Sequence, residues 1–137
     1  MILANSIKKL TDLRHEFHQY PELGFQETKT KTKIANFLRA KGLEVIEGVG
    51  VIGVLKSGSG SKTIGLRADM DALPIQETSK HTYSSKHPGV MHACGHDGHT
   101  TMLLGAAEEL ANSLDFDGTV IFIFQPNEEN GLAQKQC

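Results

Sequence analysis

The side chains with the most potential for chemistry cluster in one short segment, between residues 87 and 99. This segment holds four of the seven histidines of the 137-residue sequence, with Cys94 and Asp97 between them. A thiol, imidazoles and a carboxylate within six residues are typical metal ligands. The alternative interpretation is a polar loop with a buried cysteine and an aspartate that caps a helix. From composition alone, both interpretations stay open.

Carboxylates also follow two predicted strands, at the point where each strand ends. Asp69 and Asp71 come directly after the third strand, and Glu128 and Glu129 come shortly after the last one. Taken singly, either pair is explained by solvated surface charge. In an α/β sheet, however, sites are built at the carboxyl ends of the strands, and the histidine segment begins the helix between these two strands. Together these positions favour one site at that edge of the sheet.

The spacing of these side chains suits a hydrolase that uses a metal. Cys94 and His96 are two residues apart, so both side chains point the same way in extended backbone. Glu128 and Glu129 are adjacent, so one can bind a metal while the other faces the substrate. A bound metal lowers the pKa of its water toward ~7 and polarises the scissile carbonyl. A free carboxylate can then take the proton of the water and pass it to the leaving amine.

The elements that must position these residues alternate between helix and strand. Apolar residues at steps of three and four predict three helices. The last of these should begin with Asp97 as its N-cap, and Gly42 should follow the second in left-handed conformation. The helices are expected at 5–20, 27–41 and 98–114, and the strands at 43–47, 51–56, 63–68 and 119–125.

This order of elements favours an α/β fold with helices packed on a sheet. The first three strands lie close in the sequence, so we expect them to pair as antiparallel hairpins, because a parallel crossover needs a dozen or more residues. The third helix then connects the third strand to the last. The apolar run in the last strand is typical of a strand that is covered on both faces. The prediction is a mixed sheet with helices on both faces.

Composition and charge argue against several classes of function. With 14 basic and 16 acidic side chains and an isoelectric point near 6.4, the chain lacks the basic surface of nucleic-acid proteins, whose values exceed ~9. No stretch approaches the ~18 consecutive apolar residues of a membrane helix. No signal peptide is visible at the N-terminus. Two cysteines are too few for a disulfide scaffold, so we expect a reduced, cytoplasmic protein.

Four motifs, in order, resemble the N-terminal part of a family of metal-dependent amidohydrolases. This family includes hippurate hydrolase, N-acyl-amino-acid amidohydrolases and plant auxin-conjugate hydrolases, and its fold is that of the zinc-exopeptidase-like carboxypeptidases. The resemblance extends over nearly the whole chain, to about residue 132. The motifs are RHEFH at 14–18 with PELG at 21–24, GLRADMDALP at 65–74, HACGHDGH at 92–99 and FQPNEE at 124–129.

The resemblance implies a role for each matching position. Cys94 and His96 match two metal ligands, with Cys94 in the position that bridges two metals, and Glu129 matches a third ligand. Glu128 matches the general base. Asp71 matches the acidic residue near the site that orients a ligand or tunes the metal. The implied cofactor is one or two divalent ions of zinc, manganese, cobalt or nickel, and the implied substrate is an N-acyl amino acid or peptide.

The remaining histidines of these motifs are interpreted differently. We expect His92 and His99 to support the ligands or to be structural. We expect His15 and His18, on the first helix, to be packing or surface residues.

The resemblance also predicts how the chain relates to a whole domain. Residues 1–137 match the N-terminal part of a catalytic, metal-binding domain. Family members continue with two more histidine ligands, further strands and an inserted dimerisation domain, whereas this chain ends eight residues after Glu129. The leading hypothesis is therefore metal-dependent hydrolysis of the amide bond of N-acyl amino acids by the family, with this chain as a truncated portion that is inactive alone.

Two alternatives to a catalytic role stay open. The first is a non-catalytic fragment that binds metal weakly or forms homo-oligomers through the exposed edge of an unfinished sheet, beside strand 119–125. The second is a thiol-based protein in which Cys94 acts as a nucleophile beside His96. The first predicts association without hydrolysis. The second predicts activity that needs no metal, and it leaves the two adjacent glutamates without a role.

Overall fold

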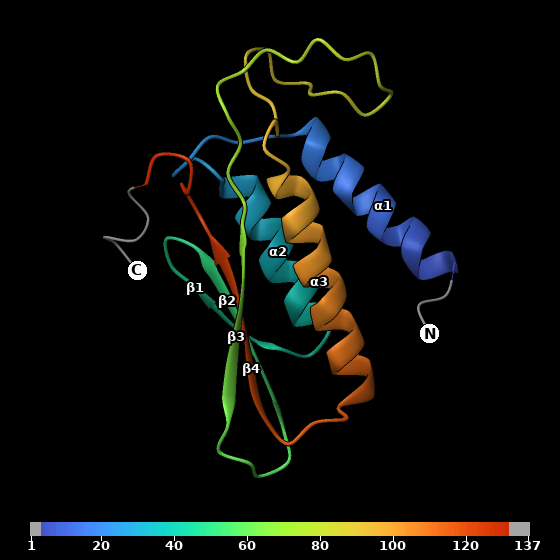
Figure 1. Ribbon diagram of the computed structural model, residues 1–137, viewed down its shortest axis with the longest axis vertical. Coiled ribbons are helices and arrows are strands. Elements are labelled where there is room, and N and C mark those ends of the chain that lie inside the picture. The colour runs from blue at the N-terminus through green and yellow to red at the C-terminus, as the bar shows by residue number, and fades with distance from the viewer. Residues whose placement is uncertain (1–3, 132–137) are drawn as a thin grey trace.

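The computed structural model describes residues 4–131, and each predicted element is found there within two residues of its expected ends (Figure 1). Helical periodicity and the left-handed Gly42, with φ of 84°, are both confirmed. The elements are α1 (Ala4–Gln19), α2 (Thr28–Ala40), β1 (Glu44–Glu47), β2 (Val51–Ser57), β3 (Thr63–Asp69), α3 (His96–Ser113) and β4 (Gly118–Gln125).

The four strands form one mixed sheet in the order β1-β2-β4-β3. β1 and β2 pair as the expected antiparallel hairpin, but the expected hairpin between β2 and β3 is wrong. β4 lies between them, antiparallel to β2 and parallel to β3. Residues 58–62 need only cross the width of one strand, roughly 10 Å, because neighbouring strands lie ~4.8 Å apart. The Asp117 carboxylate holds this crossing in place by accepting the N–H groups of Ser59 and Gly60.

The core lies between the sheet and α2 and α3. Alternate side chains of β4, among them Phe122 and Phe124, are buried against Leu38 of α2 and Leu104 of α3. α1 packs on the outer side of α3, where Leu10 meets Gly105. The predicted mixed α/β class is confirmed.

The three described helices lie together on one side of the sheet (Figure 1). The other face, with Ile52, Val54, Ile121 and Ile123, carries no helix from residues 4–131 and is partly exposed. Helices on both faces are therefore not found in the described part of the chain. The apolar run of β4 nevertheless places apolar side chains on both faces of the sheet, which is compatible with cover from both sides.

The position of β4 also changes the expected route of association. The sequence suggested that the strands flanking β4 are missing, but β2 and β3 pair with both of its edges. The outer strands of the sheet are β1 and β3. Association through an outer strand stays a prediction, with the exposed Ile64 of β3 as its apolar contact.

Candidate metal centre

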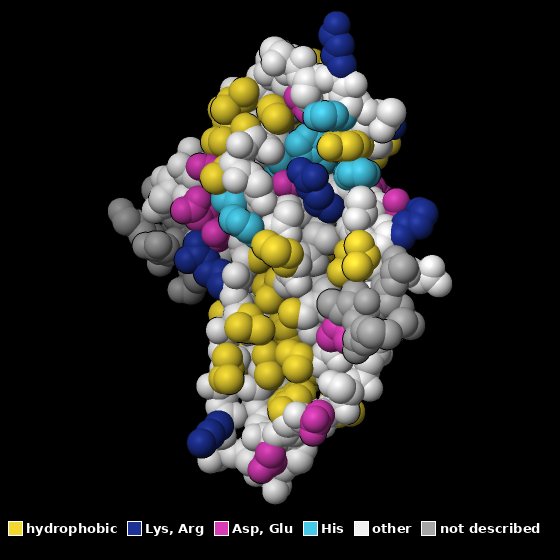
Figure 2. Space-filling view, turned by 45° about the vertical axis from the view of Figure 1, so that its right-hand side comes forward, with side chains coloured by type: hydrophobic (Ala, Val, Ile, Leu, Met, Phe, Trp, Pro, Cys, Tyr) yellow, Lys and Arg dark blue, Asp and Glu magenta, His cyan; other side chains and the backbone are white. Residues whose placement is uncertain are grey.

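The sheet topology brings the predicted carboxylates to one place. β3 and β4 are parallel neighbours, so Asp69–Asp71 and Glu128–Glu129 leave the sheet at the same end. The N–H of Met70 donates to the carbonyl of Gln125 at 3.0 Å and extends the pairing past the strand ends. α3 begins beside them. Figure 2 shows histidines with acidic and basic side chains gathered in the upper part of the displayed face, and hydrophobic side chains over the lower part.

The three predicted metal ligands converge at this end of the sheet. One ligand atom each from Cys94, His96 and Glu129 lies within 4.8 Å of the others. Nε2 of His96 is 3.8 Å from Oε1 of Glu129. That carboxylate oxygen is buried and has no hydrogen-bond partner among the described residues. A thiol, an imidazole and an unpartnered carboxylate oxygen form a donor set that fits a divalent transition metal with an open position.

Asp71 orients the histidine of this cluster. Nδ1 of His96 donates to both the side chain and the backbone oxygen of Asp71, at 3.1 and 2.9 Å. We assign the proton to Nδ1 from these contacts. When the ring is neutral, Nε2 is therefore unprotonated and directs its lone pair toward the glutamates. The second carboxylate oxygen of Asp71 accepts the backbone N–H of Glu129 at 3.1 Å. One carboxylate thus positions two of the candidate ligands.

The charges of this group are strongly coupled. Burial works to raise the pKa of the Asp71 carboxyl, but hydrogen bonds from His96 and from the backbone of Glu129 and Glu128 lower it below its ordinary value. The hydrogen bond to Asp71 raises the pKa of His96 to about 9 against the opposing effect of desolvation. Both shifts stabilise an ionised Asp71 beside the imidazole.

The same carboxylates act differently on Cys94. Its pKa is raised, first by the neighbouring Glu129 carboxylate, then by desolvation and by the other nearby negative charges. A thiol with a raised pKa stays protonated at neutral pH and is a poor nucleophile. A coordinated metal has the opposite effect, because it deprotonates the thiol that binds it. The surroundings of Cys94 therefore suit a ligand better than a free nucleophile.

Glu128 lies at the open side of the cluster. Its Oε2 is 3.8 Å from Nε2 of His96, and its side chain is 40% exposed, compared with 22% for Glu129. A second convergent group, which the sequence interpretation did not include, is formed by Asp69 with His96 and Glu128. Its signal was the position of Asp69 at the very end of β3. Arg67 already engages Asp69 through Nε and Nη2, at 3.0 and 2.6 Å.

Asp97 does not cap α3 as expected. The helix begins at His96, two residues earlier than expected, after a left-handed Gly95, and Asp97 lies buried in its first turn. Oδ2 of Asp97 accepts hydrogen bonds from Nδ1 of His18 at 2.8 Å and from Nε of Arg14 at 3.0 Å. Because α1 crosses the start of α3, its side chains bond this oxygen in place of the helix backbone, while Oδ1 of Asp97 is buried without a partner among the described residues.

The other histidines differ in burial. His18 is buried as a packing residue. It also links Asp97 to Glu77, because Nε2 of His18 lies 3.2 Å from Oε1 of Glu77. His15 stacks on Tyr83, with ring centres 3.7 Å apart. His99 is exposed, beside His96. His92 is buried, and neither ring nitrogen has a partner among the described residues. Burial lowers the pKa of His92 to about 4 and keeps it neutral.

Glu77 makes the stability of this region depend on pH. Burial acts to raise its pKa, but hydrogen bonds from Ser79, the backbone of Ser85 and His18 lower it from 4.5 to about 2. Because the pKa of Glu77 is lower in the folded chain than in the unfolded chain, its ionised carboxylate stabilises the fold. This stabilisation is complete above the pKa of the unfolded chain and is lost as the pH falls toward 2. We expect Glu77→Gln to unfold at lower urea concentration than the parent at pH 7, with a smaller difference near pH 2. Equal differences at both pH values would contradict this origin.

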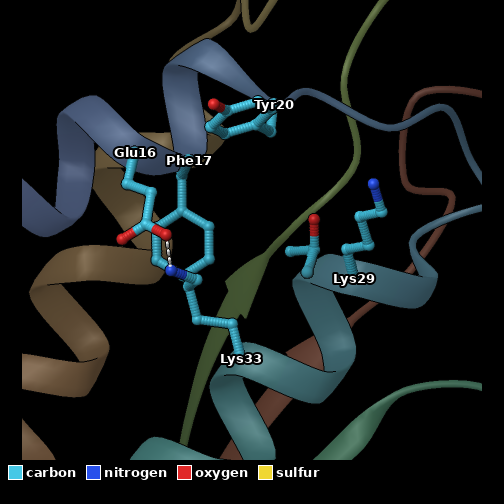
Figure 3. Close-up of a pocket in the computed structure, with 6 residues that line it drawn as sticks. Glu16, Phe17, Tyr20, Lys29 and Lys33 are labelled. Atoms are coloured by element: carbon cyan, nitrogen blue, oxygen red, sulfur yellow. Dashed lines mark ion pairs between the residues drawn. The ribbon is translucent and has the colours of Figure 1, made fainter.

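A separate hollow lies between α1 and α2, away from the ligand cluster (Figure 3). Its volume is about 100 Å³. Phe17 forms its apolar wall, and Glu16 and Lys33 form an ion pair across it. Tyr20, Lys29 and Thr30 complete the lining. The hollow contains none of the predicted site residues.

Comparison with known proteins identifies the family of this chain. Residues 65–135, just over half of the chain, match peptidase family M20/M25/M40. The chain belongs to this family. The family resemblance inferred from the four motifs is thereby confirmed, and the chain is a member of a family of hydrolytic enzymes.

Individual relatives share the same region. The chain is 55% identical over 120 residues to hippurate hydrolase of Campylobacter jejuni, a match that covers 85% of this chain and 31% of that protein. It is 46% identical over 130 residues to IAA-amino acid hydrolase ILR1-like 5 of Arabidopsis thaliana, covering 93% of this chain and 30% of that protein. The chain therefore spans about a third of the length of these relatives.

Solved structures confirm the fold. The YXEP protein of Bacillus subtilis, described as a dinuclear metal binding peptidase of the M20 family, superposes with a TM-score of 0.86 at 42% identity. The match covers 89% of this chain and 36% of that chain. None of the helices described between residues 4 and 131 combines the length and the apolar character needed to cross a membrane.

Proposed function

We propose that residues 1–137 are the N-terminal part of the catalytic, metal-binding domain of an amidohydrolase that cleaves N-acyl amino acids of the hippurate class. The observation that carries this proposal is the convergence of Cys94, His96 and Glu129, with Glu128 beside them. Membership of the M20 family and the similarity to hippurate hydrolase support the reaction class. A reducing, cytoplasmic compartment suits the free thiol of Cys94, and we propose this location on that ground.

Cys94, His96 and Glu129 would hold the metal. We propose one or two divalent ions of zinc, manganese, cobalt or nickel. The ion would supply polarisation of the scissile carbonyl and a lowered pKa of the attacking water. The hydrogen bond from His96 to Asp71 orients the ring with Nε2 toward the carboxylates. Asp71 also accepts the backbone N–H of Glu129 and so fixes the position of the third ligand.

Glu128 acts as the base in this proposal. Its carboxylate takes a proton from the attacking water as the bond between the water oxygen and the amide carbon forms. It then gives the proton to the amide nitrogen as the carbon–nitrogen bond breaks, which releases the carboxylic acid and the free amino acid. The larger exposure of Glu128 and its position at the open side of the cluster support this division of roles with Glu129.

The test combines metal uptake with hydrolysis of hippurate by the purified 137-residue chain. We expect weak binding of one divalent ion that a chelator removes easily, because the cluster of Cys94, His96 and Glu129 offers only three protein ligands. We expect no measurable hydrolysis with added manganese or zinc. The chain spans about a third of its relatives' length, and a misplacement of about 1 Å in a site can already cost ~10²-fold in rate.

Three outcomes would contradict the proposal. A chain that takes up no divalent ion would remove the metal centre. Metal-dependent turnover by the 137-residue chain would show that these three ligands suffice for catalysis. Metal-independent hydrolysis that thiol reagents abolish would favour Cys94 as a nucleophile.

A further inference from the structure

The turn that carries Glu128 and Glu129 has an unusual backbone at its first residue. Asn127 has a left-handed conformation, with φ of 50°, and is only 1% exposed. A residue other than glycine adopts this conformation at a cost, and it persists where the surrounding structure holds it. The direction in which the two glutamates leave β4 therefore depends on what holds Asn127.

A carboxylate from a distant part of the chain holds the backbone of this turn. Oε1 of Glu27 accepts the N–H of Asn127 at 2.9 Å, across a separation of 100 residues. Glu27 precedes α2 and is 2% exposed. It has no part in the chemistry assigned to the ligand cluster. A buried carboxylate aimed at one backbone N–H beside the proposed base needs its own explanation.

The side chain of Asn127 is held as well. Its Oδ1 accepts a hydrogen bond from Nδ2 of Asn130 at 2.6 Å. On the other side it packs against Gly24, where an added Cβ would lie 1.9 Å from that oxygen. Position 24 therefore requires glycine because there is no room for a Cβ atom, and not because the backbone is left-handed. This gives a physical reason for the PELG motif, which the proposed chemistry leaves unused.

The same loop also contacts the other half of the site. The carbonyl of Glu22 accepts the N–H of Ala72 at 2.9 Å, and Leu23 forms a β-bridge with Ala72. Ala72 directly follows Asp71, which orients His96. The loop at 22–27 thus touches both segments whose relative position brings the ligands together.

We propose that the loop at 22–27, through Glu27 and Gly24, is the positioning element that sets Glu128 and Glu129 against His96. The proposal rests on the proposed function and deepens it, because it assigns Glu27 as a positioning residue for the metal ligand and the base. Residues that support a ligand from outside the coordination sphere typically contribute ~10–100-fold to metal affinity. We expect an effect of this size from removal of the Glu27 carboxylate.

The test compares three variants of the 137-residue chain with the parent. Glu27→Ala removes the acceptor, and Glu27→Gln keeps an acceptor oxygen of the same reach. Glu109→Ala is the matched control, because it removes the same carboxylate from an exposed position on α3, outside the loop at 22–27. Titration with Co²⁺, followed by the thiolate-to-cobalt absorption of Cys94, measures affinity. Amide hydrogen exchange of Asn127 and Glu129 in the metal-free chain measures the turn itself.

We expect Glu27→Ala to speed exchange at both amides and to weaken Co²⁺ binding by ~10–100-fold. Glu27→Gln should stay close to the parent. Glu109→Ala should keep the parent's exchange rates and affinity. If Glu27→Ala does not fold, Gly24→Ala replaces it, with the same expected loss. Parent-like exchange at both amides in Glu27→Ala, or an equal loss of affinity in Glu109→Ala, would overturn the proposal. A parent chain that binds no Co²⁺ would refute the metal centre, and the exchange rates would still decide the role of Glu27.

Discussion

Replacement of Glu128 by glutamine is expected to lower kcat for hippurate by ~10²–10⁴-fold, the usual contribution of a general base. The experiment uses an enzyme of the relatives' full length that carries residues 1–137. Glutamine keeps the size of the side chain and removes its ability to accept the proton of the water. Because Glu128 is not among the three convergent ligands Cys94, His96 and Glu129, the metal content should stay unchanged. Steady-state kinetics with metal analysis measure both quantities.

An exposed glutamate on α3 gives a matched control. Glu109→Gln makes the same chemical change on the far part of the helix and should leave kcat unchanged. If Glu128→Gln retained the parent's kcat, Glu128 would not be the base. If it lost its metal together with its activity, Glu128 would be a ligand, as its closeness to Asp69 and His96 also permits.

Removal of any one of the three proposed ligands is expected to weaken metal binding by more than the ~10–100-fold typical of supporting residues. Cys94→Ala, His96→Ala and Glu129→Ala each leave two donors where three converge. Binding should also weaken as the pH falls. The hydrogen bond to Asp71 raises the pKa of metal-free His96 to about 9, so an ion must displace a proton below that pH. Competition with a chromophoric chelator at several pH values measures both effects.

His99→Ala is the control for these ligand variants. His99 lies beside His96, is exposed, and does not belong to the convergent group. Its removal should leave the affinity unchanged. Parent-like binding by Cys94→Ala and Glu129→Ala, or an equal loss in His99→Ala, would show that the ligand assignment is wrong.

The local elements of this protein could be read from the sequence because their causes are local. The spacing of apolar residues reports which face of a helix or strand is buried, and each described helix and strand was expected within two residues of its ends. The positions of Asp71, Glu128 and Glu129 just past strand ends, with Cys94 and His96 before a helix, also predicted one common site. That prediction needed only chain order and the rule that parallel strands present their carboxyl ends at one edge.

Pairing and long-range hydrogen bonds were decided by the tertiary structure. Periodicity shows that a strand is buried but not which strand it pairs with, so the insertion of β4 between β2 and β3 was missed. Asp97 has the sequence position of an N-cap, yet its Oδ2 bonds Arg14 and His18 of α1 once that helix packs across α3. The contact between Glu27 and Asn127 spans 100 residues and has no local signature. Such contacts depend on how whole elements pack, and a single sequence records that packing only indirectly.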